Sequence, residues 1–148
     1  MNLQSLYDSD FDAWIQQNIL LLKESRLNEI DTTHLIEELE DMGKSDKREL
    51  KNRLEVLIMH LLKWQYQAEQ RSTSWKSTIK EQRRKLNRLL KDVPSLKNNS
   101  QDAVSEIYAD AVEWASEETG LSEDIFSAQC PYTQDQLLDE NFYPDNSE

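Results

Sequence analysis

Residues 48–66 have the sequence RELKNRLEVLIMHLLKWQY, and apolar side chains cover almost every side of the helix that this stretch would form. One face carries apolar residues at spacings of three and four, namely Leu50, Leu54, Leu57, Leu61 and Trp64. The far side is covered by Met59, Leu62 and Tyr66. Because a helix that is apolar on all sides is usually surrounded by other elements, this stretch is predicted to be the central helix of the fold.

The composition favours an all-α protein. The chain has 148 residues with only 2 Gly and 3 Pro, too few turn-forming residues for a sandwich or barrel of many short strands. This length is typical of one domain, so a single helical domain over residues 1–148 is expected. The predicted architecture is a compact bundle of about five helices followed by a less regular C-terminal segment.

The sequence also bears on location. A single cysteine excludes a disulfide framework and a cysteine-based zinc site. No apolar run approaches the roughly 18 residues that span a bilayer, and the early Asp8, Asp10 and Asp12 are unlike a signal peptide. The expectation is a soluble, cytoplasmic protein with no membrane partner.

The segment before the central helix allows two interpretations. Asp31 or Thr32 is expected to cap a helix that ends at Gly43, and Ser45 a further helix through about residue 66. The alternative is one kinked helix over residues 33–66, since an interior glycine costs only about 1 kcal/mol.

Three further helices have candidate N-cap residues. These are Asp8 or Asp10 for the first helix, Ser72 or Ser74 for the fourth, and Ser100 for the fifth. The fourth helix is expected to end before Pro94, and the fifth at Gly120. In the segment 121–148, Ser122 is a candidate cap, and Thr133 with Gln136 fits a capping box. The tail over residues 145–148 is expected to fray.

Charge is strongly segregated along the chain. Residues 1–69 carry 14 acids and 8 bases, residues 70–99 carry 2 acids and 9 bases, and residues 100–148 carry 13 acids with no Lys or Arg. The net charge of −12 therefore conceals one basic island between acidic stretches. Such asymmetry permits charged partners of either sign.

The first candidate site is a polar line on the otherwise apolar central helix. It consists of Glu49, Arg53, His60, Lys63 and Gln67, interrupted by Val56. A histidine can transfer protons near neutral pH, so His60 and Lys63 are the catalytic candidates of an alternative function as an enzyme or metal-dependent protein. The other interpretation is a hydrogen-bonded core histidine beside a lysine whose amine reaches water.

The fourth helix has two different faces. A heptad-like apolar seam runs through Trp75, Ile79, Gln82, Leu86, Leu89 and Val93. The basic residues are expected on the opposite side: Lys76, Lys80, Arg83, Arg84, Arg88 and Lys91. Such a face could bind the phosphates of a nucleic acid, or it could simply be solvated. Nucleic-acid binding is therefore kept as an alternative function.

The fifth helix carries acidic residues where the fourth carries basic ones. Its acidic side contains Asp102, Glu106, Asp110, Glu113 and Glu117. If both helices direct their apolar sides to one core, these two charged faces point outward and can meet only between molecules. The segregation therefore favours self-association or another charged protein as partner, with Trp114 or the pair Phe142 and Tyr143 as apolar anchors.

Metal and nucleophile signals are weak. His34, Glu37 and Glu38 have the i, i+3, i+4 spacing of possible ligands, but a di-iron bundle needs Glu-x-x-His on two helices. A solvated acidic face is the favoured interpretation of these residues. Cys130 precedes Pro131 with no histidine nearby in sequence, so a structural role is expected. No cofactor is predicted.

Several motifs together resemble the bacterial family catalogued as domain of unknown function 29. They are LYDSDFDAW at 6–14, LIEELEDMG at 35–43, MHLLKWQYQ at 59–67, RSTSW at 71–75, TIKEQR at 78–83, EETGL at 117–121 and CPYT at 130–133. The resemblance covers the chain from Leu6 to about residue 144. It implies a compact all-helical domain and supplies no catalytic residues.

The resemblance directs attention to the corner between the third and fourth helices, KWQYQAEQRSTSWK at 63–76. Here Gln67, Arg71 and Lys76 lie among aromatic residues that include Trp75. Such a corner can form a small pocket, or it can be a hydrogen-bonded turn that fixes the two helices. The structural interpretation is favoured. The predicted function is that of a non-enzymatic protein-interaction module.

Overall fold

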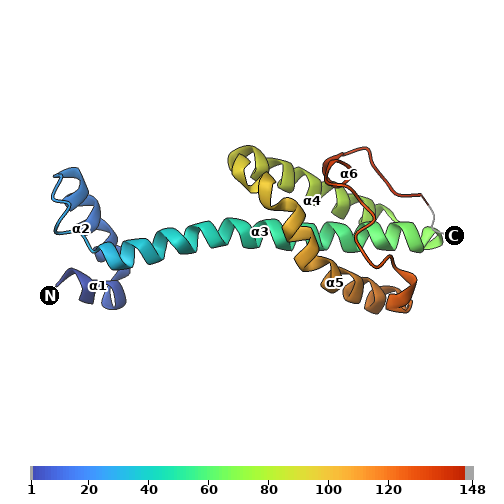
Figure 1. The fold of residues 1–148 in the computed structure, drawn as a ribbon, viewed down its shortest axis with the longest axis horizontal. Helices are drawn as coiled ribbons and strands as arrows, with labels where there is room; N and C mark the ends of the chain where they lie inside the picture. The colour runs from blue at the N-terminus through green and yellow to red at the C-terminus, as the bar shows by residue number, and fades with distance from the viewer. Residues whose placement is uncertain (1, 146–148) are drawn as a thin grey trace. The chain divides into compact units, whose positions relative to one another are not determined.

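A computed structural model describes residues 2–145 of the chain (Figure 1). Within this range the secondary structure is helical and contains no strand, which confirms the predicted all-α class. The chain divides into two compact units, Met1–Ser45, called the N-terminal unit below, and Asp46–Glu148, called the C-terminal unit. The expected frayed tail falls largely on residues 146–148, outside the described range.

The N-terminal unit contains α1 (Leu3–Ser9), α2 (Phe11–Lys23) and the beginning of α3 (Thr32–Tyr66). The Asp10 side chain accepts a hydrogen bond of 3.1 Å from the backbone N–H of Ala13 and caps α2, as predicted. The short α1 was not anticipated from the sequence. Asn2 caps α1 by accepting a 2.7 Å hydrogen bond from the Ser5 backbone.

Of the two interpretations of this segment, the single helix is confirmed and the break at Gly43 is wrong, because α3 is one helix over Thr32–Tyr66. Gly43 lies in its interior and lacks the positive φ that a helix-terminating glycine adopts. Ser45 lies inside the same helix and caps nothing there. An interior glycine weakens a helix by about 1 kcal/mol, which is too little to interrupt one that continues into a packed core.

The C-terminal unit is built around the second half of α3. Figure 1 shows α4 (Thr73–Asp92) and α5 (Ser100–Thr119) on either side of it. Buried leucines and isoleucines of α3 and α4 form one cluster with alanines and other apolar residues of α5. The prediction of a central apolar helix is thereby confirmed for residues 50–62.

The remaining elements of this unit are short. They are η1 (Ala68–Gln70), η2 (Pro94–Asn99), η3 (Glu123–Ile125) and α6 (Gln134–Leu138). The predicted caps are present at Ser72 and Ser122. Gly120 ends α5 with a left-handed φ of 76°, and Thr133 with Gln136 forms the predicted capping box.

Candidate functional site

The structure brings His60 and Lys63 together on the inner part of α3. The His60 Nδ1–H donates a hydrogen bond of 2.8 Å to the Val56 carbonyl, one turn earlier. Lys63 is only 6% exposed. Its Nζ lies 3.6 Å from the Glu118 carboxylate of α5 and 4.6 Å from the centre of the Trp75 ring.

The electrostatics of this cluster keep the imidazole neutral. Burial lowers the pKa of His60, and the nearby charge of Lys63 lowers it further. The hydrogen bond to Val56 and the charge of Glu118 oppose this shift without reversing it. The polar groups therefore have structural partners, which agrees with the core-histidine interpretation. Glu118 was missed because no spacing in the sequence links it to residues more than 50 positions earlier.

The corner between α3 and α4 is held by Arg71. Its Nε–H donates a 2.8 Å hydrogen bond to the Trp64 carbonyl, and its guanidinium lies 4.9 Å from the Trp64 ring centre. Gln67 and Trp75 are half-buried beside this turn, and Lys76 is exposed. Arg71 thus satisfies a carbonyl at the end of α3, which supports the structural interpretation of the corner.

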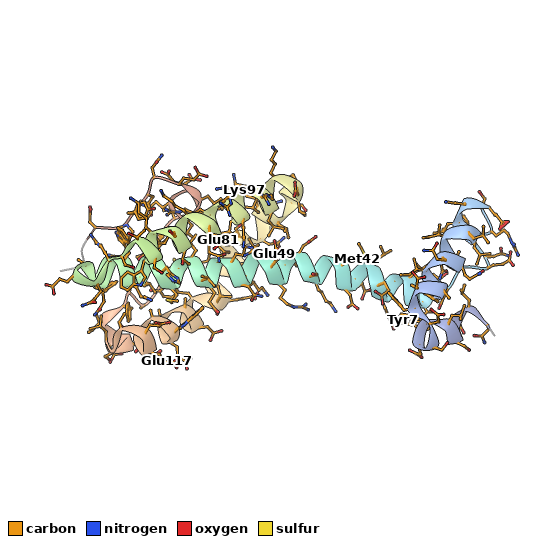
Figure 2. The ribbon with its side chains drawn as sticks, turned by 180° about the vertical axis from the view of Figure 1, so that it is seen from behind. Tyr7, Met42, Glu49, Glu81, Lys97 and Glu117 are labelled. Carbon is orange, nitrogen blue, oxygen red and sulfur yellow. The ribbon has the colours of Figure 1, made fainter. Side chains whose placement is uncertain are left out.

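Arg83 does not belong to the basic face where the sequence analysis placed it. Its side chain has 0% relative exposure, whereas Lys76, Lys80, Arg84 and Arg88 are exposed. Arg83 lies at the edge of the apolar seam, one turn after Ile79, and it is covered by residues from the end of the chain. The exposed basic residues that remain on α4 are Lys76, Lys80, Arg84, Arg88 and Lys91, with Lys97 following in η2 (Figure 2).

The buried Arg83 binds three backbone carbonyls of the C-terminal segment. Its guanidinium donates to the carbonyls of Gln136 at 3.1 Å, Leu137 at 3.0 Å and Phe142 at 2.6 Å. The guanidinium carbon also lies 5.5 Å from the Tyr143 ring centre. The planar fork of an arginine suits several fixed acceptors at once, so this residue attaches the segment to α4.

The acidic side of α5 is partly neutralised within the molecule. The Nζ atom of Lys51 in α3 lies 2.5 Å from the Glu106 carboxylate, and Lys63 forms an ion pair with Glu118. Acidic residues of α5 are therefore balanced in part by α3, a contribution that the sequence analysis overlooked. Among residues 2–145, no ion pair joins α4 to α5.

The expected apolar anchors are half-buried rather than freely presented. Phe142 and Tyr143 pack against the core, with the Tyr143 ring centre 4.9 Å from that of Trp64. The Phe142 ring lies 6.0 Å from Tyr132. Trp114 also packs against the core cluster.

The N-terminal unit is organised by Asp31, which is 3% exposed. Its carboxylate accepts hydrogen bonds from Trp14 Nε1–H at 2.9 Å and from His34 Nδ1–H at 2.6 Å. The Asp31 backbone N–H donates to Asn18 at 3.0 Å. Burial alone would raise the pKa of Asp31, but the hydrogen bonds from Trp14 and His34 outweigh it and hold the pKa below its ordinary value.

The three proposed metal ligands are not arranged around a common point. His34 is bound to Asp31, and Glu38 accepts a hydrogen bond from the Tyr7 hydroxyl. This bond and the charge of Glu38 raise the pKa of Tyr7 to about 12. Glu37 is exposed. Over residues 2–145, no group of three or more potential ligands is placed to hold a metal ion.

The N-terminal unit exposes an unusual amount of apolar side chain. Of the nine large hydrophobic side chains that are exposed in the described chain, eight lie in this unit: Phe11, Ile19, Leu20, Leu22, Leu27, Ile36, Leu39 and Met42. Leu39 is 64% exposed, and Met42, whose side chain is labelled in Figure 2, is 65% exposed. In contrast, Trp14 is the only fully buried hydrophobic residue that residues 2–45 contribute.

Six of these eight exposed residues form two helical stripes. On α2, Phe11, Ile19 and Leu22 share one side, and on α3, Ile36, Leu39 and Met42 follow one another at spacings of three. The two sets are called the apolar stripes below. Helical periodicity shows which side of a helix is apolar and does not show what covers it.

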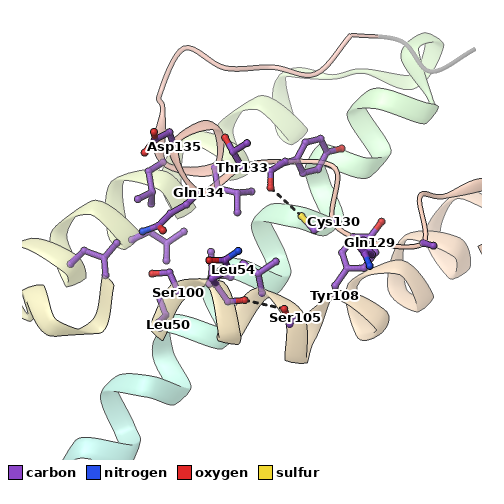
Figure 3. A pocket seen from close by; sticks show the side chains of 18 residues that line it. Leu50, Leu54, Ser100, Ser105, Tyr108, Gln129, Cys130, Thr133, Gln134 and Asp135 are labelled. Carbon is purple, nitrogen blue, oxygen red and sulfur yellow. Dashed lines mark hydrogen bonds between the residues drawn. The ribbon is translucent and has the colours of Figure 1, made fainter. Parts of the chain in front are cut away.

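A pocket of about 790 Å³ lies in the C-terminal unit, between α3, α4, α5 and the C-terminal segment (Figure 3). Its buried part is formed by leucines and aromatic residues: Leu50, Leu54, Leu86, Tyr108, Tyr132 and Leu137. Exposed side chains surround the opening, among them Gln101, Ser105, Gln129 and Asp135. This pocket could not be anticipated from the sequence, because its walls come from four separate parts of the chain.

The fold and its surfaces define an all-α protein that combines a well-packed helical unit with an N-terminal unit bearing uncovered apolar helices. Within residues 2–145, none of the helices has both the length and the apolar character needed to cross a membrane. The chain belongs to the family described as Domain of unknown function DUF29, whose family model matches residues 6–143. The resemblance inferred from the sequence is thereby confirmed. Neither a curated protein nor a solved structure matches the chain.

Proposed function

We propose that this protein is a non-enzymatic interaction module of the bacterial cytoplasm and that the apolar stripes of its N-terminal unit bind a basic, amphipathic segment of another protein. The observation that carries this proposal is the concentration of eight exposed large hydrophobic residues in that unit. Exposed apolar surface of this kind marks interaction sites in folded proteins. The lone thiol of Cys130, which is free, suits a reducing compartment.

The energetics of the N-terminal unit support a partner. A segment of about 40 residues rarely buries enough apolar surface to be stable alone, and this unit has Trp14 as its one fully buried hydrophobic residue. Covering the apolar stripes would therefore add stabilisation where the unit lacks it. Amphipathic helices commonly supply such cover, with anchors at spacings of three and four.

The negative charge of the N-terminal unit indicates which charge its partner carries. Residues 1–45 contain 10 Asp and Glu against 3 Lys and Arg, for a net charge of −7. Exposed acids follow the stripe of α3, including Glu37, Glu40 and Asp41. Pairing this surface with its own copy would bring like charges together, whereas a basic segment would be attracted. A heterologous basic partner is therefore favoured over self-association.

Synthetic peptides can test this proposal on the full chain. The probe is a lysine- and leucine-containing peptide with an amphipathic helical pattern. One control peptide has glutamate in place of lysine, and another has the basic composition in scrambled order. We expect the basic amphipathic peptide to bind more tightly than either control, and its affinity to fall as salt is added. Isothermal titration calorimetry measures all three.

A matched pair of variants locates the binding surface. The double variant Leu39→Ser with Met42→Ser removes two exposed apolar side chains of the α3 stripe. It is expected to lower the affinity for the basic peptide at least about tenfold. Ile125→Ser removes the exposed hydrophobic residue of the C-terminal unit and is expected to leave binding unchanged. Equal binding of the acidic and basic peptides would contradict the proposal. So would a dimer, seen by light scattering, that the double variant dissociates.

The exposed bases of α4 support nucleic-acid binding as a second candidate function. Five exposed Lys and Arg residues on one helix form a surface that phosphates could contact. A labelled duplex tests this directly. Slower migration of the duplex in a gel, lost at high salt and in the variant Arg84→Glu with Arg88→Glu, would establish nucleic-acid binding. Unchanged mobility of the duplex would exclude it.

A further inference from the structure

The pocket of the C-terminal unit is large enough for a ligand. Cavities that bind small molecules commonly have volumes of about 300–1,000 Å³ with mostly apolar walls and few polar groups. The present pocket has about 790 Å³, and seven aliphatic side chains line it: Leu50, Leu54, Leu86, Leu90, Val104, Leu137 and Leu138. It lies wholly within the C-terminal unit and shares no residue with the apolar stripes.

One polar group of the pocket lacks a partner. The side-chain nitrogen of Gln134 is buried and makes no hydrogen bond. An unpaired buried donor costs free energy that a bound acceptor would recover. Other polar groups in the walls are already engaged: the Tyr108 hydroxyl donates to the Ser127 carbonyl at 2.7 Å, and that of Tyr132 donates to Gln65 at 2.7 Å.

The charges of the lining residues indicate which head group a ligand of this pocket carries. None of the lining residues is a lysine or arginine, and Asp135 is the one carboxylate among them. Burial raises the pKa of the Cys130 thiol and also those of the Tyr108 and Tyr132 phenols, so these groups are neutral at physiological pH. An anionic head group would find no cation here and would face a carboxylate at the opening.

We infer that this pocket binds an uncharged, mainly aliphatic molecule and that the Gln134 side chain donates a hydrogen bond to the oxygen of its head group. The aliphatic part lies among the leucines of α3, α4 and α6, where it removes apolar surface from water. The oxygen lies at the Gln134 amide, whose nitrogen is buried in the pocket wall and turns toward the ligand by rotation about its broad terminal torsion. Gln134 lines the pocket together with Ser105 and Cys130 (Figure 3).

Three ligands with one chain length test the head-group preference: decan-1-ol, decanoate and decylammonium. Cys130 is the only cysteine of the protein and lines the pocket. Its rate of reaction with a thiol reagent therefore reports occupancy of this pocket, and binding to the apolar stripes leaves it unaffected. We expect decan-1-ol to slow the reaction at the lowest concentration, and decanoate to require at least about a fivefold higher concentration.

Two variants, each with a matched control, locate the binding site. Gln134→Leu is expected to weaken decan-1-ol binding about threefold to tenfold, whereas Gln70→Leu, at an exposed glutamine outside the pocket, leaves it unchanged. Ser105→Phe places a ring at the exposed opening and is expected to abolish protection of Cys130. Ser95→Phe makes the same change at an exposed serine elsewhere and is expected to have no effect. Circular dichroism confirms that each variant is folded.

The proposal would be overturned by any of three results. The first is that decan-1-ol fails to protect Cys130 in the unmodified chain. The second is that decanoate protects as well as decan-1-ol does. The third is that the folded variants Gln134→Leu and Ser105→Phe keep the protection of the unmodified protein. Because none of these results depends on peptide binding, failure here leaves the proposed function of the N-terminal unit untouched.

Discussion

Arg83 places a positive charge inside the C-terminal unit, and its hydrogen bonds go to backbone carbonyl groups. Substituting Arg83→Lys keeps the charge but removes the planar fork, so the ammonium cannot satisfy the three carbonyls in their present positions. We expect the free energy of unfolding to fall by about 2–4 kcal/mol. Chemical denaturation followed by circular dichroism measures this loss.

The neighbouring Arg84 provides the control for this substitution. It is exposed on the same helix, so Arg84→Lys is expected to change the free energy of unfolding by less than about 0.5 kcal/mol. Similar effects of the two substitutions would show that the contacts of Arg83 contribute little. Hydrogen exchange adds a local measurement, because amides of residues 134–143 should lose protection in the Arg83 variant alone.

The neutral state of His60 predicts a dependence of stability on pH. Because its pKa is lower in the folded protein than in the unfolded chain, the unfolded chain binds more protons as the pH falls through the ordinary histidine value of about 6.5. Stability is therefore present above that value and is lost below it. Substituting His60→Asn should reduce the fall in melting temperature between about pH 7.5 and about pH 5.5.

The comparison uses the unmodified protein and the variant in the same buffers, so that contributions from other groups largely cancel. Asparagine keeps an N–H donor close to the position of Nδ1, which preserves the bond to Val56. A variant that loses as much stability over this range as the unmodified protein would contradict the prediction.

At the level of residues, the sequence predicted contacts only where both partners lie close together in the chain. The capping box of Thr133 and Gln136 is an example, since its two residues are three positions apart. The burial of Arg83 was not predictable in this way, because the carbonyls that it binds come more than 50 residues later. Helical periodicity assigned it to the basic side of the helix, whereas the structure buries it.

One of the two glycines lies in a helix interior and the other ends a helix. Gly43 lies inside α3, and a Cβ added there would meet no atom within 4 Å. Gly43→Ala is therefore expected to raise the free energy of unfolding by about 0.5–1 kcal/mol, because alanine loses less conformational entropy on entering a helix. Urea denaturation followed by far-ultraviolet circular dichroism provides the measurement.

Gly120 is the matched control at the end of α5. Its φ of 76° lies in the left-handed region, so Gly120→Ala should lower the free energy of unfolding by about 1–2 kcal/mol although no atom obstructs the new Cβ. Destabilisation by Gly43→Ala would contradict the assignment of Gly43 to a helix interior, and stabilisation by Gly120→Ala would contradict the left-handed conformation of Gly120.

At the level of elements, capping chemistry predicted the starts of α2 and α4 and the end of α5. The predicted cap at Ser100 is wrong, because Ser100 is the first residue of α5 and its hydroxyl donates back to the Leu96 carbonyl. The starting residues Asp10 and Ser72 and the terminating Gly120 are where the sequence placed them. The error at Gly43 arose because glycine is compatible with both a helix end and a helix interior. Only the packing of the flanking segments decides between these, and packing is not a local property of the sequence.

The whole molecule distributes its burial very unevenly. Almost all buried hydrophobic residues belong to the C-terminal unit, with Trp14 as the exception. We expect amides of α2 to exchange with deuterium at least about tenfold faster than those of residues 50–63, since regions with few buried apolar contacts open at low free-energy cost. Hydrogen exchange followed by mass spectrometry measures both regions in one experiment.

Uniform protection across both regions would contradict this expectation. The basic amphipathic peptide described above provides a second comparison, because bound peptide should slow exchange in the N-terminal unit and leave residues 50–63 unchanged. A peptide that protects both regions equally would indicate a different binding surface.

At the level of the whole molecule, the sequence predicted the class of the fold and missed its most exposed surface. The residues Phe11, Leu39 and Met42 have the spacing of core residues, and the structure leaves them exposed. An apolar helix face has the same pattern whether it is covered by its own chain or by another. The pocket was equally inaccessible to prediction, because its walls combine segments that are distant in sequence.

The attachment of the C-terminal segment to Arg83 has a consequence for how this sequence can change over time. Arg83 binds backbone oxygens on both sides of residues 139–141, whose side chains are exposed. Substitutions at these three positions leave the acceptors in place, whereas an insertion or deletion there would move the Phe142 carbonyl out of reach. Among related chains, this short connection should therefore keep its length more strictly than its composition.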